Sequence, residues 1–155
     1  TDIGIIAGTV RTENLEVIPY RNDYLMLVVP RLHALAGEAA VDFAQTLDYD
    51  HVCLSEASAI HIFLRQVCEQ EHRRMRIRIQ VGVGVGILPA SAAARHAQSM
   101  NIALVPLNDA WSLRAQKICV RNLDALPSFA RDLVTLLVQD RERAETSSQV
   151  EHRGA

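Results

Sequence analysis

The sequence predicts an α/β protein in which short buried strands alternate with helices. Short apolar runs recur at residues 3–7, 51–54 and 102–107, and such runs are typical of strands that are buried on both faces. Residues 60–68 repeat apolar side chains at the spacing of an amphipathic helix. Strand-like segments followed by helix-like segments are typical of layered α/β domains.

Length and composition fit one globular domain or two small lobes. The chain has 155 residues, of which 49% are hydrophobic and 22% are charged, so a real core can form. Its net charge of −2 gives no electrostatic reason to expect a nucleic-acid-binding module. No apolar run approaches the roughly 18 residues of a membrane span, so we expect no membrane partner.

The cysteines indicate the cellular compartment. Cys53, Cys68 and Cys119 are widely spaced, and no C-x-x-C motif is present. An odd number of such residues predicts free thiols in a reducing compartment. We therefore expect a cytoplasmic protein.

The first half of the chain predicts two strands, a short helix and a third strand. Residues 15–19 and 24–29 are strand-like, and the polar residues 21–23 between them predict a turn. A short helix is expected over 41–47. The residues from His51 to Leu54 then read as a brief buried strand.

The second half predicts helices and strands in alternation. A helix is expected from Pro89 to about Gln98, because proline suits the first turn of a helix. Strands are expected at 102–107 and 117–121. The last helix begins at Pro127, and its charged end lies at residues 140–143. Trp111, the only tryptophan, precedes the second strand, and we expect it to be a packing anchor rather than a ligand-stacking residue.

The turn after residues 51–54 is the strongest functional candidate on physical grounds. Ser55 and Ser58 are of a type that commonly caps helices, and a helix start carries free N–H groups with partial positive charge. A carboxylate or phosphate of a small ligand would be stabilised there. The alternative is that both serines only cap the helix. Glu56 adds negative charge at this end, so it either points to solvent or selects a cationic or hydroxyl group.

A second candidate lies after the apolar run 3–7. Gly8 and Thr9 stand at its carboxyl end, which is where ligands bind in open α/β sheets. Thr9 offers a hydroxyl group, and Gly8 offers an accessible backbone N–H. From the residues alone, a plain loop is the favoured interpretation.

The glycines at 82, 84 and 86 follow an alternating polar and apolar run at residues 76–79. They do not match the dinucleotide fingerprint G-x-G-x-x-G, because Ile87 stands three residues after Gly84. We expect these glycines to let a buried backbone pack closely against a neighbouring element.

No set of residues supports catalysis or metal binding. Cys68 and His72 have an acceptable spacing for two metal ligands, but no second pair completes a site. For Cys53, nothing argues for a lowered thiol pKa. The motifs of common hydrolases and nucleotide-binding enzymes are absent from the sequence. We therefore expect no catalytic residue, no metal and no cofactor. The arginines at 73, 74, 76 and 78 form a basic cluster. As a phosphate-contacting patch it is interrupted by the buried-looking face of Ile77 and Ile79, and no aromatic residues interleave for base stacking. A solvated strand or an interface edge is the favoured interpretation.

Several segments, taken in order, resemble the effector-binding domain of LysR-type transcriptional regulators. The joint order makes the resemblance specific, and it spans nearly the whole chain up to about Gln139. The segments are DIGIIAG (2–8), PYRNDYLMLVVPRLHALA (19–36), LDYDHVCLSEASAIHIFL (47–64), GVGVGILP followed by SAAAR (82–95), VPLNDAWSLRAQKICVRN (105–122) and LPSFARDLVTLL (126–137).

The resemblance implies two Rossmann-like lobes joined by two crossing strands, like a type 2 periplasmic binding protein. Lobe I would comprise residues 1–18 and 108–143, lobe II would comprise 19–107, and the polar residues 144–155 would form a disordered tail. The ligand would bind in the cleft between the lobes. The implied ligand-binding residues are Ala7, Gly8, Thr9, Ser55, Glu56, Ser58 and Ala59.

The chain departs from the family in two places. It starts at the DIGI strand, so the first lobe is incomplete. Family members usually carry a further helix between the positions of Val81 and Gly82. Either that helix is deleted here or the sequence lacks residues that the protein contains, and we favour the second.

The resemblance implies a sensor of a small polar or anionic metabolite. The expected partners are this effector, further copies of the chain in a homodimer or homotetramer, and DNA only through an N-terminal helix-turn-helix domain outside this chain. The alternative is a solute-binding protein of a transport system, which would need an export signal and an oxidising compartment.

Overall fold

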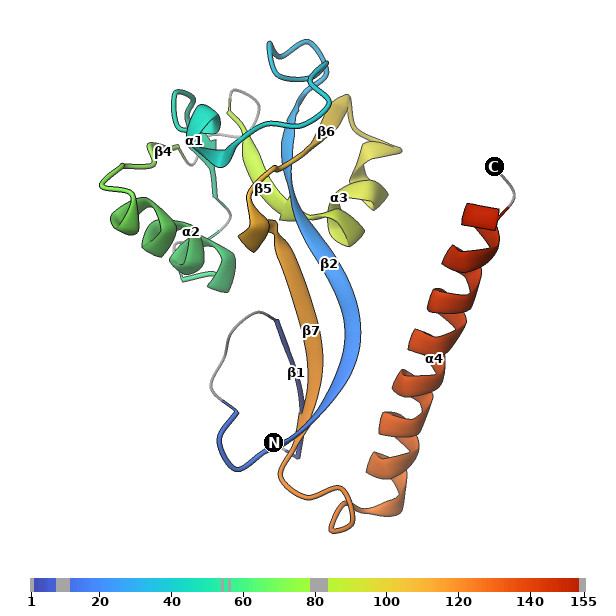
Figure 1. Cartoon of the computed structure of the whole chain (residues 1–155). Coiled ribbons are helices and arrows are strands. Elements are labelled where there is room, and N and C mark those ends of the chain that lie inside the picture. Colours follow the sequence, from blue (N-terminus) through green and yellow to red (C-terminus); the bar gives the residue numbers. More distant parts are fainter. Residues whose placement is uncertain (1, 8–11, 54, 56, 79–83, 154–155) are drawn as a thin grey trace. The chain divides into compact units, whose positions relative to one another are not determined.

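The computed structural model describes residues 2–7, 12–53, 55, 57–78 and 84–153 (Figure 1). The chain forms two compact units. Unit 1 contains residues 1–22 and 114–155, and unit 2 contains residues 23–113. These limits differ by a few residues from those of the predicted lobes. The arrangement of the two lobes around a cleft stays a prediction.

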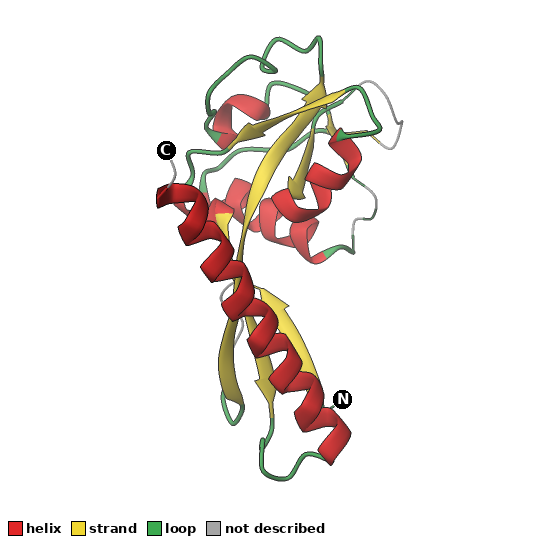
Figure 2. Cartoon of the chain, turned by 90° about the vertical axis from the view of Figure 1, so that its right-hand side faces the viewer, coloured by secondary structure: helices red, strands yellow, loops and turns green. Residues whose placement is uncertain are grey.

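Unit 1 is an antiparallel sheet packed against one long helix. Strand β1 (Ile3–Ala7) pairs with β7 (Leu113–Val120), and β7 is followed in the sheet by β2 (Glu16–Pro30). Helix α4 (Ser128–Arg153) lies along one face of these strands (Figure 2). The buried residues that join the helix to the sheet are Ile118, Val120, Leu126, Ala130 and Val134.

Unit 2 is built around the second part of β2. This part pairs antiparallel with β5 (Gly86–Pro89) on one side and with β6 (Ile102–Pro106) on the other. A second small sheet pairs β3 (His51–Val52) with β4 (Ile77–Arg78) in parallel.

Four helical segments complete unit 2. They are α1 (Phe43–Thr46), α2 (Ala59–Gln70), α3 (Ala90–Ala97) and the 3-10 helix η1 (Ala110–Ser112). Helix α2 packs Leu64, Val67 and Cys68 into the core of the unit. Trp111 contacts Phe43 and Phe63 edge to face, with ring centroids 5.3 Å apart in both pairs, which confirms that it is a packing anchor.

The predicted turn at residues 21–23 is wrong, because β2 is one continuous strand of 15 residues. Asp23, a residue that often forms turns by bonding its own backbone, is 9% exposed. Its carboxylate accepts hydrogen bonds from the Tyr24 and Ser91 backbone N–H groups, at 2.9 and 3.2 Å, and from the Ser91 hydroxyl. Since Ser91 lies in α3, this carboxylate ties the strand to that helix.

The disordered tail expected at residues 144–155 stays a prediction, while the last helix runs past its expected charged end at residues 140–143. Helix α4 continues to Arg153. Between Ser128 and Arg153 the sequence contains neither glycine nor proline, the two residues that disfavour a helix interior most strongly.

The other predicted elements are confirmed, with shifted limits. The run 51–54 is β3, although Leu54 lies outside the described residues. The amphipathic pattern forms α2, the segment after Pro89 forms α3, and residues 102–107 contain β6. Strand β7 starts at Leu113, before the predicted start at Lys117.

One glycine of the 82–86 run confirms the expected close packing. A Cβ atom on Gly84 would lie 2.6 Å from the Asp50 carbonyl oxygen and 2.8 Å from the Val52 Cγ2 atom. A Cβ atom on Gly86 would meet nothing within 4 Å. Gly82 and the junction of Val81 with Gly82, where family members carry a further helix, lie outside the described residues. Within the described part of the chain, no helix is both long enough and apolar enough to cross a membrane.

Candidate ligand-binding site

The start of α2 is fixed by Ser58. Its backbone is extended (φ −68°, ψ 142°), and its Oγ accepts a hydrogen bond from the His61 backbone N–H at 3.2 Å. This confirms Ser58 as the N-cap. Ser55 lies three residues before Ser58. Its Oγ accepts a hydrogen bond from the Ala57 N–H at 3.2 Å, and its carbonyl oxygen accepts one from the Ser58 N–H at 3.1 Å. The two serines therefore shape the turn together, and only Ser58 caps the helix.

A cavity of about 150 Å³ lies beside this turn, within unit 2. Its walls come from β3, α2 and β5, and most of its side chains are apolar. It is lined by His51, Val52, Cys53, Ser58, Ile60, His61, Leu64, Met75, Ile87 and Leu88. Small-molecule sites commonly enclose about 300 to 1,000 Å³. This cavity therefore suits a compact group or one end of a ligand.

The electrostatics at this turn favour an acidic group. The first N–H groups of a helix lack partners within the helix and carry partial positive charge. A carboxylate or phosphate at the start of α2 would be stabilised by them. The Cys53 thiol donates to the Ser55 carbonyl oxygen at 3.1 Å, so it helps to hold the turn.

Two buried histidines line the cavity. His51 is 2% exposed, and burial lowers its pKa despite the opposing effects of the Thr46 carbonyl and Asp50. Its Nε2 atom lies 3.1 Å from the Thr46 carbonyl oxygen, so Nε2 carries the proton of a neutral ring. His61 is 3% exposed. The sequence analysis missed it, although it shares a helix face with Leu64 and Cys68 at i, i+3 and i+7.

The structure brings only some of the predicted residues to this cavity. Ser58 lines it, Ala59 begins α2, and Ser55 lies exposed in the preceding turn. Glu56, Gly8 and Thr9 lie outside the described residues. Ala7 belongs to unit 1.

Ala7 has an arginine beside it that the sequence analysis missed. Its carbonyl oxygen accepts from the Arg114 Nη2 atom at 3.3 Å. The guanidinium therefore stands at the carboxyl end of β1, where the sequence predicted a ligand contact. The sequence analysis expected this strand to begin at Lys117, so it did not assign Arg114 to a strand. Strand β7 begins at Leu113, and Gln116 is the partner of Ala7, so Arg114 lies just beyond the end of β1.

The structure shows no arrangement of metal ligands among the described residues, where no three His, Cys, Asp or Glu side chains gather. Cys68 is 4% exposed. His72 lies beyond the end of α2 with a positive φ of 54°. The helical spacing that would pair these two residues therefore does not persist to His72.

The sequence matches the family model described as LysR substrate binding domain over residues 1–82. That is more than half of the chain. The chain belongs to this family. The match ends at residue 82, which is where the sequence analysis expected a further helix. No curated protein gives a significant match to the sequence.

Solved structures share this fold at low sequence identity. The effector-binding domain of QuiR, in complex with shikimate, has a TM-score of 0.70 at 16% identity, over 92% of this chain and 72% of that one. The regulatory domain of CcmR from Synechocystis PCC6803, in complex with 2-PG, has a TM-score of 0.75 at 13% identity, over 90% and 73%. The effector-binding domain of BenM with benzoate has a TM-score of 0.72 at 19% identity, over 93% and 71%.

These likenesses and the family match define the fold. It is the type 2 periplasmic-binding-protein fold of LysR substrate-binding domains, present here in part. The chain covers 52% of a full-length BenM variant, so a whole regulator of that kind contains much that this chain does not.

Proposed function

We propose that this chain is the effector-binding domain of a LysR-type transcriptional regulator and that it binds a small polar or anionic metabolite. The family match over residues 1–82 carries the proposal. The cavity beside the Ser58 cap supports it, because it joins a helix start to an apolar wall. QuiR, CcmR and BenM are bound to shikimate, 2-PG and benzoate, and acids of this size suit the start of α2.

The proposed ligand-binding residues come from both units. Ser55, Glu56, Ser58 and Ala59 would receive the acidic group at the start of α2. Ala7, Gly8 and Thr9 would contact the ligand from the end of β1, and Arg114 would add positive charge there. In this proposal the two groups face one inter-lobe cleft.

The ligand would act by shifting the protein between two conformations. A ligand changes such an equilibrium only through different affinities for the two states. The altered domain would change subunit pairing in a homodimer or homotetramer. That change would be relayed to helix-turn-helix domains outside this chain, in the cytoplasm and without catalysis.

The free cysteines Cys53, Cys68 and Cys119 suit a reducing compartment, which disfavours the alternative function as a solute-binding protein of a transport system.

Ligand-induced thermal stabilisation tests this proposal. The melting temperature of the chain is measured with shikimate, 2-PG, benzoate and related small acids. We expect at least one of them to raise it. The variant Ser58→Ala should lose most of the increase. Ser99→Ala is the control, because the exposed Ser99 hydroxyl contacts only the His96 carbonyl oxygen in the described structure.

Two results would contradict the proposal. If no small carboxylate or phosphate ester raises the melting temperature, the proposed ligand class is wrong. If Ser58→Ala and Ser55→Ala both fold and keep the full increase, the ligand binds elsewhere.

A further inference from the structure

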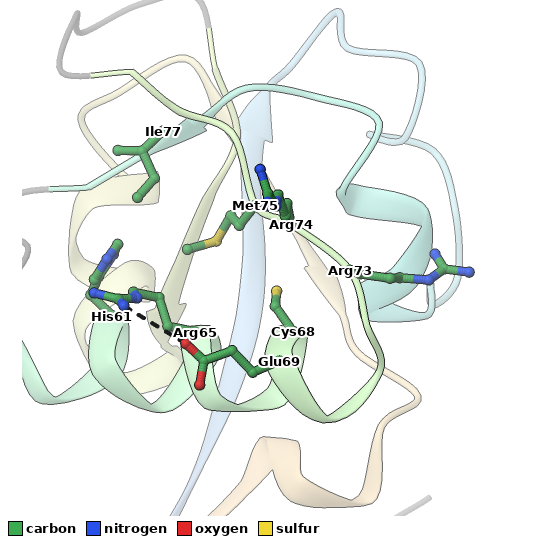
Figure 3. Close-up of a pocket in the computed structure, with 8 residues that line it drawn as sticks. All are labelled: His61, Arg65, Cys68, Glu69, Arg73, Arg74, Met75 and Ile77. Carbon is green, nitrogen blue, oxygen red and sulfur yellow. Dashed lines mark ion pairs between the residues drawn. The ribbon is translucent and has the colours of Figure 1, made fainter.

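A second and larger cavity lies along the C-terminal part of α2 (Figure 3). Its volume is about 500 Å³, which falls within the usual range of small-molecule sites. One wall is α2 and the other is the segment that leads to β4. It is lined by His61, Arg65, Cys68, Glu69, Arg73, Arg74, Met75 and Ile77, all within unit 2. We call it the basic cavity.

The lining carries an excess of positive charge, although the chain has a net charge of −2. Three arginines face one acidic residue, Glu69. Arg65 and Glu69 lie one helical turn apart and form an ion pair at 3.7 Å, and both side chains are more than half exposed. A pair of this kind contributes little, so Arg65 can turn to another anion.

The arginines that follow in the chain differ in their partners. Arg76 and Arg78 both pair with Asp50, at 3.6 and 2.6 Å. Arg73 donates to the Ala44 carbonyl oxygen at 3.3 Å and extends away from the other lining residues in Figure 3. Arg74 forms no ion pair with any residue that the structure describes. Arg65 and Arg74 are therefore the guanidinium groups most able to receive a ligand.

The floor of the basic cavity adds no opposing charge. Cys68 is buried, and that burial, with Glu71 nearby, raises the pKa of its thiol, so it stays neutral. Met75 and Ile77 supply apolar surface. Among the described residues that line the cavity there is no Phe, Tyr or Trp, so this part of the lining offers no stacking platform for single-stranded nucleic acid.

We propose that the basic cavity binds a phosphate group, either free phosphate or a small phosphate ester, between Arg65 and Arg74. Guanidinium groups bind phosphate oxygens in pairs of charge-assisted hydrogen bonds. This site is separate from the proposed effector site at the start of α2. His61 and Met75 line both cavities, and the Ser58 cap holds the His61 backbone. Occupancy of one cavity can therefore influence the other.

Isothermal titration of the whole chain with inorganic phosphate, and in parallel with glycerol 3-phosphate, tests the proposal. The ionic strength is held constant with sodium chloride, because a change in ionic strength would itself alter the attraction between phosphate and the arginines. We expect saturable binding of at least one of the two. Arg65→Gln and Arg74→Gln should each weaken it about tenfold. The matched control is Arg31→Gln, because Arg31 is exposed, lies in unit 2 and is not among the residues that line the cavity.

The outcomes separate this site from the effector site. Phosphate binding that survives Ser58→Ala and is weakened about tenfold in Arg74→Gln supports the proposal, whether or not effector binding changes. Binding that is lost in Ser58→Ala and survives Arg74→Gln places phosphate at the start of α2 and overturns it. Equal weakening by Arg31→Gln, absence of saturation, or a response only to single-stranded DNA or to an acidic protein overturns it as well.

Discussion

The Oγ atom of Ser58 lies 3.2 Å from the His61 backbone nitrogen and accepts its hydrogen bond. His61, in turn, lines both cavities beside α2. Ser58 therefore has a structural role in addition to any contact with a ligand. Ser58→Ala should lower the free energy of unfolding by about 1 kcal/mol, the usual effect of losing a serine cap. Urea denaturation measures it. Ser58→Asp, which keeps a capping oxygen, should be nearly as stable as the wild type. Equal stability of Ser58→Ala and the wild type would refute the cap.

The close approach of Gly84 to the Asp50 carbonyl oxygen predicts a strong effect of adding one methyl group. In Gly84→Ala the Cβ atom would meet that oxygen at 2.6 Å, where backbone must shift. We expect a loss of about 1 to 3 kcal/mol in the free energy of unfolding, as for other overpacked sites. Gly86→Ala is the control, since nothing lies within 4 Å of its Cβ position. Similar losses in both variants would show that glycine flexibility matters here and close packing does not.

The buried carboxylate of Asp23 ties β2 to the first turn of α3. It accepts from Ser91 through both the backbone N–H and the hydroxyl. Asp23→Ala should destabilise the chain by about 2 kcal/mol, because hydrogen bonds to a charged group are strong and Ser91 would lose its partner. Asp23→Asn should recover part of the loss. Chemical denaturation of Asp23→Ala, Ser91→Ala and the double variant should show coupling between the two residues. Additive effects would contradict the contact.

Burial of His51 predicts a pH dependence of stability. Burial lowers the pKa of the folded histidine below its ordinary value of 6.5. Below about pH 6.5 the unfolded chain binds a proton at His51 and the folded chain resists it, so His51 lowers stability as the pH falls. The free energy of unfolding should therefore fall more steeply toward acid in the wild type than in His51→Gln. The difference should reach at most about 1.4 kcal/mol per pH unit. Parallel profiles for the two proteins would contradict it.

The three free cysteines should differ in reactivity. Cys68 and Cys119 are buried, whereas Cys53 is only partly buried. Burial also raises the pKa of the Cys68 thiol, and the thiolate is the reactive form. A disulfide reagent at mildly alkaline pH should therefore modify Cys53 first, and Cys53→Ser should remove the fast phase. A fast phase that persists in Cys53→Ser would show that a buried thiol is accessible.

Local patterns in the sequence predicted the helix that carries the site. Ser58 and the apolar spacing of α2 lie within a few residues of one another, so capping and amphipathicity could be read together. The continuity of β2 could not be read in this way. Within that strand Asp23 bonds to Ser91, 68 positions later, and a turn was the natural interpretation of the polar residues alone.

The two cavities also depend on contacts between distant segments. The basic cavity joins Arg65 on α2 to Arg74 on the following segment, whereas the sequence analysis grouped Arg73, Arg74, Arg76 and Arg78 as one surface. Asp50 separates them, because among the described arginines it pairs with Arg76 and Arg78 and not with Arg73 or Arg74. Arg114 lies beside Ala7 because β7 pairs with β1. Neither relationship has a signature within one segment.

The backbone amide spectrum of the chain, recorded by NMR during titration with the acid that most raises its melting temperature, tests the central claim most directly. The largest shifts should fall on the N–H groups of residues 57–61, and they should saturate together. If these signals stay unchanged while others respond, the start of α2 does not receive the ligand and the proposed site is wrong.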